Sequence, residues 1–266
     1  MYRFMNRVNK DFNQDFKEYG PLWQWSVDNL TDFWDTAWKF LDILHSQPYS
    51  KALTHKDKMP GAKFFAGARL NFAENLLRFR DDRPALIFRG EDSVRRVLTY
   101  NQLHEEVAKT SAALRAMGIK KGDRVVGFVP NMPESIIAML AAVSLGAVWS
   151  SCSPDFGIKG VLDRFGQTRP RVLFTADGYF FKGKPLDSLQ RIAGIVKELP
   201  SSEKIVVIPY VSDAPDISGL DHAVLYEDFE DDTAQEIEFE QVEFDHPLYI
   251  MYSSGTTGLP KCMVQS

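Results

Sequence analysis

The chain has 266 residues, 44% of them hydrophobic and 25% charged, which is an ordinary globular composition with enough apolar residues for a sizeable core. Its net charge of −5 provides no basic field for nucleic acid or an anionic membrane, so local cations would have to hold an anionic substrate. The two cysteines, Cys152 and Cys262, suggest neither a disulfide framework nor a metal knuckle, and the expected compartment is the reducing cytoplasm.

Neither a membrane span nor a secretory signal is expected from the sequence. Residues 1–7 lack the apolar region of a signal peptide. The longest apolar run, residues 136–149, is too short to cross a bilayer and is interrupted by Ser144 and Gly146.

Residues 1–80 are rich in aromatic side chains and contain four of the five tryptophans. Thr31 is expected to cap a helix that has Asp32 and Asp35 in its first turn. Apolar residues then recur at helical spacing: Phe33, Trp34, Ala37, Trp38, Leu41 and Leu44. This stripe favours a helix packed on a larger body, with an aromatic ligand cage as the alternative. A second short helix is expected within residues 71–79.

From residue 84 onward, strands and helices are expected to alternate. The sequence predicts a hairpin of 85–88 with 95–98, a capping box at 99–102, and a helix that ends at Gly118. Further strands are expected at 124–129, 147–150, 172–175, 204–208, 223–226 and 249–252, and further helices from Pro133 to Gly146, at 158–168 and at 185–199. Repeated units of this kind predict an α/β fold with a mostly parallel sheet and helices on both faces. Ligands of such folds bind beyond the carboxyl ends of the strands.

The acidic stretch at residues 210–245 is expected to be a solvated surface segment. A metal site there is the alternative, but no histidine is interleaved among the carboxylates, and no metal site is predicted. The histidines His104, His222 and His246 lack metal-ligand spacing and are expected to be structural. Cys152 is expected to be a buried apolar residue and not a nucleophile.

The most informative stretch is the polar loop that follows the strand at 249–252. Gly255 and Gly258 allow backbone N–H groups to turn toward one anion. Four hydroxyl groups add further donors, from Ser253, Ser254, Thr256 and Thr257. Pro260 stiffens the end of the loop, and Lys261 supplies a positive charge. The combination predicts a polyphosphate-binding loop, and the alternative is a polar turn between two strands.

The spacing of this loop excludes two common phosphate-binding motifs. A Walker A loop has two glycines five residues apart, with Lys and Ser or Thr directly after the second. Here the glycines are three apart and Lys261 is followed by Cys262. A kinase glycine-rich loop, Gly-x-Gly-x-x-Gly, is absent.

Residues 252–261 resemble the signature loop of the adenylate-forming enzymes, which comprise acyl-CoA synthetases, luciferases and the adenylation domains of peptide synthetases. In that family a loop ending in Pro-Lys holds the triphosphate of ATP. Cys262 is a departure, because many members have glycine after the lysine. Phe33-Trp34 and the segment 64–75 are similar to the N-terminal extension of the short-chain acyl-CoA synthetases, and residues 68–76 are most similar to the branch that acts on acetoacetate.

The resemblance implies that residues 1–80 are this N-terminal extension. Residues 81–266 would be the first part of the AMP-binding adenylation domain, which is the large N-terminal domain of these enzymes. This part would be truncated after the phosphate loop, and the small C-terminal domain would be absent. It implies a ligase that uses ATP, Mg²⁺, CoA and a short carboxylic acid, and a chain that is inactive by itself. Lys261 and Thr256 would be catalytic. The residues that would bind the ATP phosphates are Ser253, Ser254, Gly255, Thr256, Thr257, Gly258 and Lys261.

The same resemblance points to two segments near CoA. Lys182, Gly183 and Lys184 occupy the place of a basic segment that approaches the 3′-phosphate of CoA in the acetyl-CoA synthetase relatives, although only Lys184 aligns directly. Phe156 lies in a turn that aligns with a CoA-proximal turn but contains fewer glycines. The alternative for the lysines is a surface loop with solvated charges.

Three other functions stay open from the sequence. The first is a synthetase for another short acid such as acetate, because the acyl pocket is expected after residue 266. The second is a non-catalytic nucleotide-binding half-domain. The third is a P-loop NTPase, which the glycine spacing disfavours.

Overall fold

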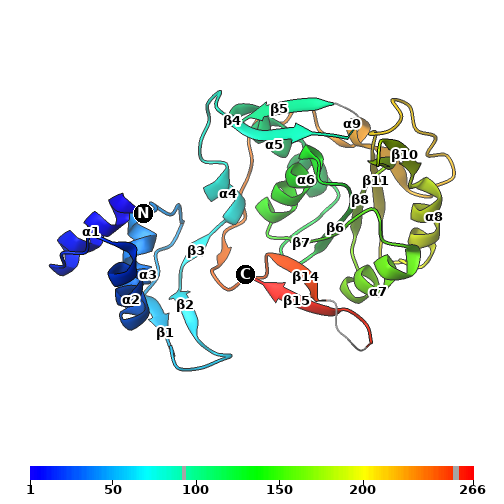
Figure 1. Cartoon of the computed structure of the whole chain (residues 1–266). Helices are drawn as coiled ribbons and strands as arrows, with labels where there is room; N and C mark the ends of the chain where they lie inside the picture. Colours follow the sequence, from blue (N-terminus) through cyan, green and yellow to red (C-terminus); the bar gives the residue numbers. More distant parts are fainter. Residues whose placement is uncertain (92–93, 254–257) are drawn as a thin grey trace. The chain divides into compact units, whose positions relative to one another are not determined.

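The structure is a computed structural model that describes residues 1–91, 94–253 and 258–266, and it contains two compact units. One unit comprises Met1–Asn71 and Gln241–His246, and the other comprises Phe72–Glu240 and Pro247–Ser266 (Figure 1). These units meet in the chain between Asn71 and Phe72. The functional domain boundary expected between residues 80 and 81 stays a prediction.

The first unit begins with three helices whose apolar faces meet. They are α1 (Tyr2–Phe12), α2 (Tyr19–Asp28) and α3 (Leu30–Phe40). Met5, Val8, Leu22 and Trp25 form a buried cluster of this unit. The predicted cap at Thr31 is wrong, because α3 begins at Leu30 and has Asn29 at its N-cap. The helix starts early because the Asn29 amide still bonds to the carbonyl of Trp25, which leaves no free turn between α2 and α3.

The aromatic residues of the first unit pack against one another as a core. Trp38 and Phe65 are buried with ring centroids 4.6 Å apart, and Phe244 lies 4.8 Å from Phe65. Short strands complete the unit, namely β1 (Lys51–Thr54) with β2 (Lys63–Ala66) and β3 (Arg69–Leu70) with β13 (Val242–Glu243). This packing supports the core interpretation of the aromatic stripe. Leu41 and Leu44 lie beyond the end of α3 and are exposed, contrary to their predicted place on the stripe.

The second unit is built on a seven-stranded sheet. Its strands, in spatial order, are β12 (Ala223–Leu225), β11 (Lys204–Ile208), β8 (Val172–Ala176), β6 (Arg124–Phe128), β7 (Val148–Cys152), β14 (Tyr249–Ser253) and β15 (Lys261–Gln265). Every neighbouring pair is parallel except β14 and β15, which are antiparallel. The predicted mostly parallel sheet is therefore confirmed.

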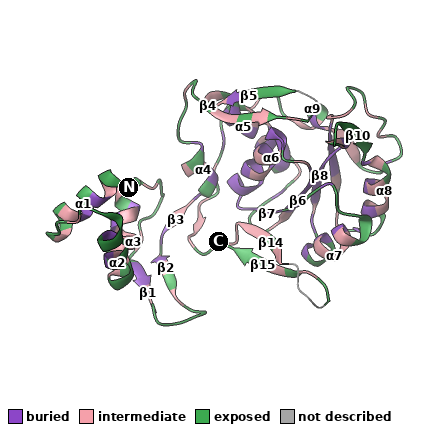
Figure 2. Ribbon diagram, viewed as in Figure 1, coloured by how far each residue is buried: buried purple, intermediate pink, exposed green. Residues whose placement is uncertain are grey.

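Helices cover both faces of this sheet because successive side chains of a strand point to opposite faces. The helices are α5 (Tyr100–Ala116) and α6 (Pro133–Ser144) on one face, and α7 (Ile158–Thr168) and α8 (Leu189–Lys197) on the other. Val125 packs in the cluster that contains α5 and α6, whereas its neighbour Val126 packs in the cluster that contains α7 and α8. Figure 2 shows the buried residues on the sheet and on the helix faces toward it.

Several predicted ends of elements are present in the structure. Thr99 and Gln102 form the predicted capping box at the start of α5, and Gly118 follows its end with a φ of 74°. Pro133 opens α6. The predicted hairpin pairs β4 (Pro84–Arg89) with β5 (Arg95–Thr99). Two short helices, α4 (Phe72–Leu76) and α9 (Tyr226–Phe229), complete the described elements of this unit together with a hairpin at residues 178–187.

The helix predicted at residues 185–199 is partly wrong. Its first residues form β10 (Lys184–Asp187), which pairs with β9 (Gly178–Phe181), and α8 begins only at Leu189. Lys182 and Gly183 both have positive φ, 52° and 72°, as in the two-residue turns that match the twist of a hairpin. The turn therefore directs residues 184–187 back along β9 before a helix can start.

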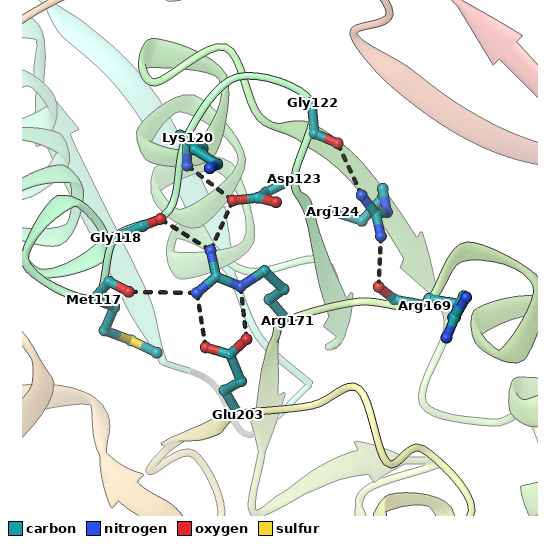
Figure 3. A network of polar contacts seen from close by, with 9 residues as sticks. All are labelled: Met117, Gly118, Lys120, Gly122, Asp123, Arg124, Arg169, Arg171 and Glu203. Atoms are coloured by element: carbon teal, nitrogen blue, oxygen red, sulfur yellow. Dashed lines mark hydrogen bonds and ion pairs between the residues drawn. The ribbon is translucent and has the colours of Figure 1, made fainter.

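An ion-pair network joins the amino ends of three strands (Figure 3). Because these strands run parallel to β14, the network lies at the end of the sheet opposite the carboxyl end of β14. The Arg171 guanidinium donates to both carboxylate oxygens of Glu203, at 2.7 and 2.8 Å, and to Asp123 at 2.7 Å. It also donates to the carbonyl of Gly118 at 2.9 Å. These contacts raise the pKa of Arg171, and the hydrogen bonds from Arg171 lower the pKa of Glu203. The network holds together the residues that directly precede β6, β8 and β11.

His104 is buried in α5, and its Nε2 atom has no hydrogen-bond partner among the described residues. Burial, helped by the charge of Arg80, lowers the pKa of His104 to about 4, although Glu236 acts in the opposite direction. The folded state therefore binds this proton less readily than the unfolded state. We expect the free energy of unfolding to fall by up to about 3 kcal/mol through this residue as the pH decreases from about 6.5 to about 4.

Urea unfolding of wild type and His104→Leu at several pH values measures this contribution. The variant should show a flatter pH dependence across that window, whereas a change at the exposed His222, His222→Asn, should leave the wild-type dependence intact. A His104→Leu curve parallel to that of wild type would contradict the prediction.

Candidate functional site

The polar loop joins β14 to β15, at the carboxyl end of a strand in the parallel sheet. Ser253 ends β14 and lies opposite Lys261, the first residue of β15. The structure thus brings together two residues that were predicted to bind phosphate. Four others, Ser254, Gly255, Thr256 and Thr257, lie outside the described residues, so their roles stay predictions.

The described end of the loop has the backbone and the charge expected of it. Gly258 has a φ of 87°, a conformation that residues with a side chain rarely adopt. Lys261 is exposed and forms no ion pair with any described residue. Its charge is therefore available to an anion held at the carboxyl end of β14.

A cavity of about 490 Å³ lies beside β7 and β14. One part of its wall is apolar and another carries serine hydroxyls. The lining residues include Ser135, Ile136, Met139, Trp149, Ser150, Ser151, Cys152, Ser153, Phe156, Arg164, Tyr249 and Tyr252. Arg164 is the only charged side chain among the described residues that line it. Such a mixed wall can hold an elongated ligand with both apolar and polar groups.

Tyr252, the penultimate residue of β14, is fixed from the neighbouring strand. Ser150 of β7 is hydrogen-bonded to the Tyr252 hydroxyl at 2.9 Å and donates to the carbonyl of Ile250 at 2.7 Å. Burial raises the pKa of Tyr252 to about 12, so the phenol stays protonated near neutral pH. Its role at this site is therefore to hydrogen-bond and pack rather than to exchange a proton.

Cys152 is buried at the end of β7, as predicted, and burial raises the pKa of its thiol to about 12. Because the thiolate is the reactive form, this cysteine is poorly suited to nucleophilic attack. The lowering effect of the nearby Arg164 charge does not overcome the burial.

The structure separates the residues that were predicted to contact CoA. Phe156 lines the cavity, whereas Lys182, Gly183 and Lys184 lie at the turn of the β9–β10 hairpin and do not line it. The Gly183 amide donates to the carboxylate of Glu91 at 3.0 Å, which places a negative charge beside the two lysines. The binding of the CoA 3′-phosphate by Lys182 and Lys184 stays a prediction.

Sequence reasoning missed Arg164, Ser150 and Gln167. The predicted helix at 158–168 placed Arg164 and Gln167 one turn apart, but no local motif marks them. Only the packing of α7 against the β14–β15 hairpin brings them to the site (Figure 1).

Comparison with known proteins gives the family. Residues 72–266 match the AMP-binding enzyme family, and residues 19–76 match the acetyl-coenzyme A synthetase N-terminus family. This chain belongs to the AMP-binding enzyme family.

Among the described residues, no helix is both long and apolar enough to cross a membrane, and no three His, Cys, Asp or Glu side chains gather as a metal site.

Relatives match over almost the whole chain. Acetoacetyl-CoA synthetases of Gallus gallus and Rhizobium meliloti are each 45% identical over 100% of this chain and 41% of their own length. The solved structure of acetoacetyl-CoA synthetase from Streptomyces lividans superposes with a TM-score of 0.92 at 42% identity, covering 99% of this chain and 41% of that one. The chain thus spans about two fifths of the length of these relatives. The predicted fold, part of the large N-terminal domain of an adenylate-forming enzyme, is confirmed.

Proposed function

We propose that this chain supplies the ATP phosphate-binding part of an acyl-CoA synthetase that acts on acetoacetate. The observation that carries the proposal is the similarity to acetoacetyl-CoA synthetases over the whole chain, including the strand and loop at residues 249–261. The whole reaction would convert acetoacetate, ATP and CoA into acetoacetyl-CoA, AMP and pyrophosphate.

The proposed reaction has two steps. First, a carboxylate oxygen of the acid attacks the α-phosphorus of ATP. The bond from that phosphorus to the bridging oxygen breaks, so an acyl-adenylate forms and pyrophosphate leaves. Second, the CoA thiol, after losing its proton, attacks the acyl carbon, and AMP leaves as the carbon–oxygen bond breaks. Both steps depend mainly on positioning and on neutralising charge on the phosphates.

In this proposal the loop between β14 and β15 holds the β- and γ-phosphates of ATP. Lys261 and Ser253 lie side by side at its described ends, and Gly258 supplies a left-handed backbone turn. Thr256, with Lys261, is proposed as catalytic on the strength of the resemblance. Mg²⁺ is proposed as a companion of the phosphates. The described residues offer no cluster of His, Cys, Asp or Glu that would hold this ion by themselves.

The proposal also covers CoA, the compartment and the acid. Phe156 and the cavity beside β7 are proposed to lie on the CoA side of the site. Two unpaired cysteines fit a reducing compartment, and we propose the cytoplasm.

A second candidate acid is malonamate. It is favoured by the similarity to a malonamoyl-CoA synthetase of Penicillium aethiopicum, which is 37% identical over 99% of this chain.

An ATP–pyrophosphate exchange assay tests this function in a protein that carries this sequence at the length of its relatives. Acetoacetate, malonamate and acetate are supplied separately, and the CoA thioester is then quantified. We expect exchange that depends on the acid and is fastest with acetoacetate. Exchange fastest with another acid would reassign the substrate, and no acid-dependent exchange would contradict the proposal.

Replacement of both Lys182 and Lys184 by alanine is expected to raise the KM for CoA roughly tenfold if they bind its 3′-phosphate, because each exposed charge pair contributes about 1 kcal/mol or less. The KM for dephospho-CoA, which lacks that phosphate, should hardly change. Lys197→Ala, at an exposed position of α8, serves as the control. A parallel rise for both thiols would show that the lysines do not contact this phosphate.

A further inference from the structure

The end of β14 that leads into the polar loop has no backbone ladder with β7. β14 pairs with β7 only at Tyr249 with Trp149 and at Ile250 with Ser150. From Met251 to Ser253 its only ladder partner among the described residues is β15, which is itself the edge of the sheet. Side chains must therefore help to fix residues 251–253 and 261, and the hydrogen bond between Ser150 and the Tyr252 hydroxyl is one such contact.

Helix α7 contacts the limb of the hairpin that enters the loop. The guanidinium carbon of Arg164 lies 4.3 Å from the ring centroid of Phe156 and 5.7 Å from that of Tyr252. A planar guanidinium is suited to stacking on aromatic faces. Its Nη1 atom donates to the carbonyl of Gly160 at 2.7 Å, which anchors the side chain to its own helix. Arg164 forms no ion pair with a described residue. No described carboxylate therefore competes with the two rings for the guanidinium.

The same helix also contacts the limb that leaves the loop. The amide nitrogen of Gln167 donates to the carbonyl of Pro260 at 3.0 Å, directly before Lys261. It donates as well to the carbonyl of Asp163 at 2.6 Å, one turn back along α7. Residues three apart on a helix lie on one face, so Arg164 and Gln167 point the same way. One face of one helix therefore touches both limbs.

We propose that Arg164 and Gln167 are positioning residues that hold the two limbs of the β14–β15 hairpin, and with them Ser253 and Lys261, in the geometry that accepts ATP. The inference rests on the proposed function. Arg164 also stacks on Phe156, which lines the cavity, so it links the cavity wall to β14. Gln167 does not line the cavity, and its contact outside α7 is with the carbonyl of Pro260.

The two contacts predict different kinetic effects. Gln167→Ala should raise the KM for ATP about three- to tenfold and leave the KM for CoA unchanged. Arg164→Met, which keeps an unbranched apolar stem but removes the planar cation, should raise both KM values about tenfold. Arg164→Lys keeps the charge without the flat face and should restore only part of the loss. Lys159→Ala, at an exposed position of the same helix, should behave as wild type.

Amide hydrogen exchange measured on the same variants supplies a readout that does not depend on catalysis. In Arg164→Met and Gln167→Ala, exchange should accelerate at residues 249–253 and 261–265 and stay unchanged in β6 and β8. Unaltered exchange at the hairpin would overturn the proposal. Accelerated exchange with an unchanged KM for ATP would overturn it as well, because the contacts would then not position the ATP site.

These outcomes are separate from the fate of the proposed function. If the wild-type protein shows no acid-dependent pyrophosphate exchange, the function is wrong, and the role of Arg164 and Gln167 in ATP positioning falls with it. If the wild-type protein is active but the variants match the Lys159→Ala control, only the positioning proposal is wrong.

Discussion

Replacement of Lys261 by alanine is expected to slow the ATP-dependent half-reaction by about 10- to 100-fold, because a hydrogen bond to a charged group contributes roughly 1.5–3 kcal/mol. Lys261 lies opposite Ser253 at the end of the loop and is exposed. None of the described residues neutralises its charge as an ion-pair partner. The CoA half-reaction should change little, because pyrophosphate has already left when the thiol attacks.

The two half-reactions can be measured separately to test this prediction. Pyrophosphate exchange reports formation of the acyl-adenylate, and thioester formation from preformed acyl-adenylate reports the second step. Lys261→Arg keeps a positive charge and should retain more activity than Lys261→Ala. Lys197→Ala is the control for loss of a surface lysine. Equal losses in both half-reactions would argue against a role for Lys261 with the ATP phosphates.

Replacement of Asp177 by alanine is expected to lower the free energy of unfolding by about 3–5 kcal/mol. Asp177 directly follows β8 and is only 2% exposed. Its Oδ1 atom accepts the amides of Tyr210 and Val211 at 2.8 and 3.0 Å, and Oδ2 accepts the amide of Ser212 at 2.9 Å. Alanine would leave three backbone donors without this acceptor, in the segment that follows β11.

Urea unfolding of the chain, followed by circular dichroism, measures this loss. Asp177→Asn should cost less, about 1–3 kcal/mol, because one oxygen can still accept and the amide group disturbs only the other contact. The control is Asp216→Ala, which removes an exposed carboxylate that also accepts a backbone amide, that of Ser218, at 3.0 Å. That change should cost far less than Asp177→Ala, because water can replace the lost acceptor at an exposed position. A similar cost for Asp177→Ala and Asp216→Ala would contradict the prediction.

Local signals in the sequence determined most elements of the second unit. The capping box at Thr99 and Gln102, the glycine at 118 and the proline at 133 each act through the backbone of their own turn. Such signals can be recognised without knowledge of the fold. The polar loop is also contiguous, so its glycines, hydroxyls and lysine could be identified as a unit, and with them the family.

The tertiary structure alone decided the features that depend on residues far apart in the chain. Residues 184–187 form a strand because β9 is there to pair with them, and Thr31 is not a cap because α2 ends directly before α3. The acceptor role of Asp177 requires residues 210–212, and that of the Pro260 carbonyl requires Gln167, which is 93 positions away. Helical spacing placed Arg164 and Gln167 on one face of α7. It could not indicate that this face meets both limbs of the loop, because that contact exists only once the sheet has brought β14 beside β7.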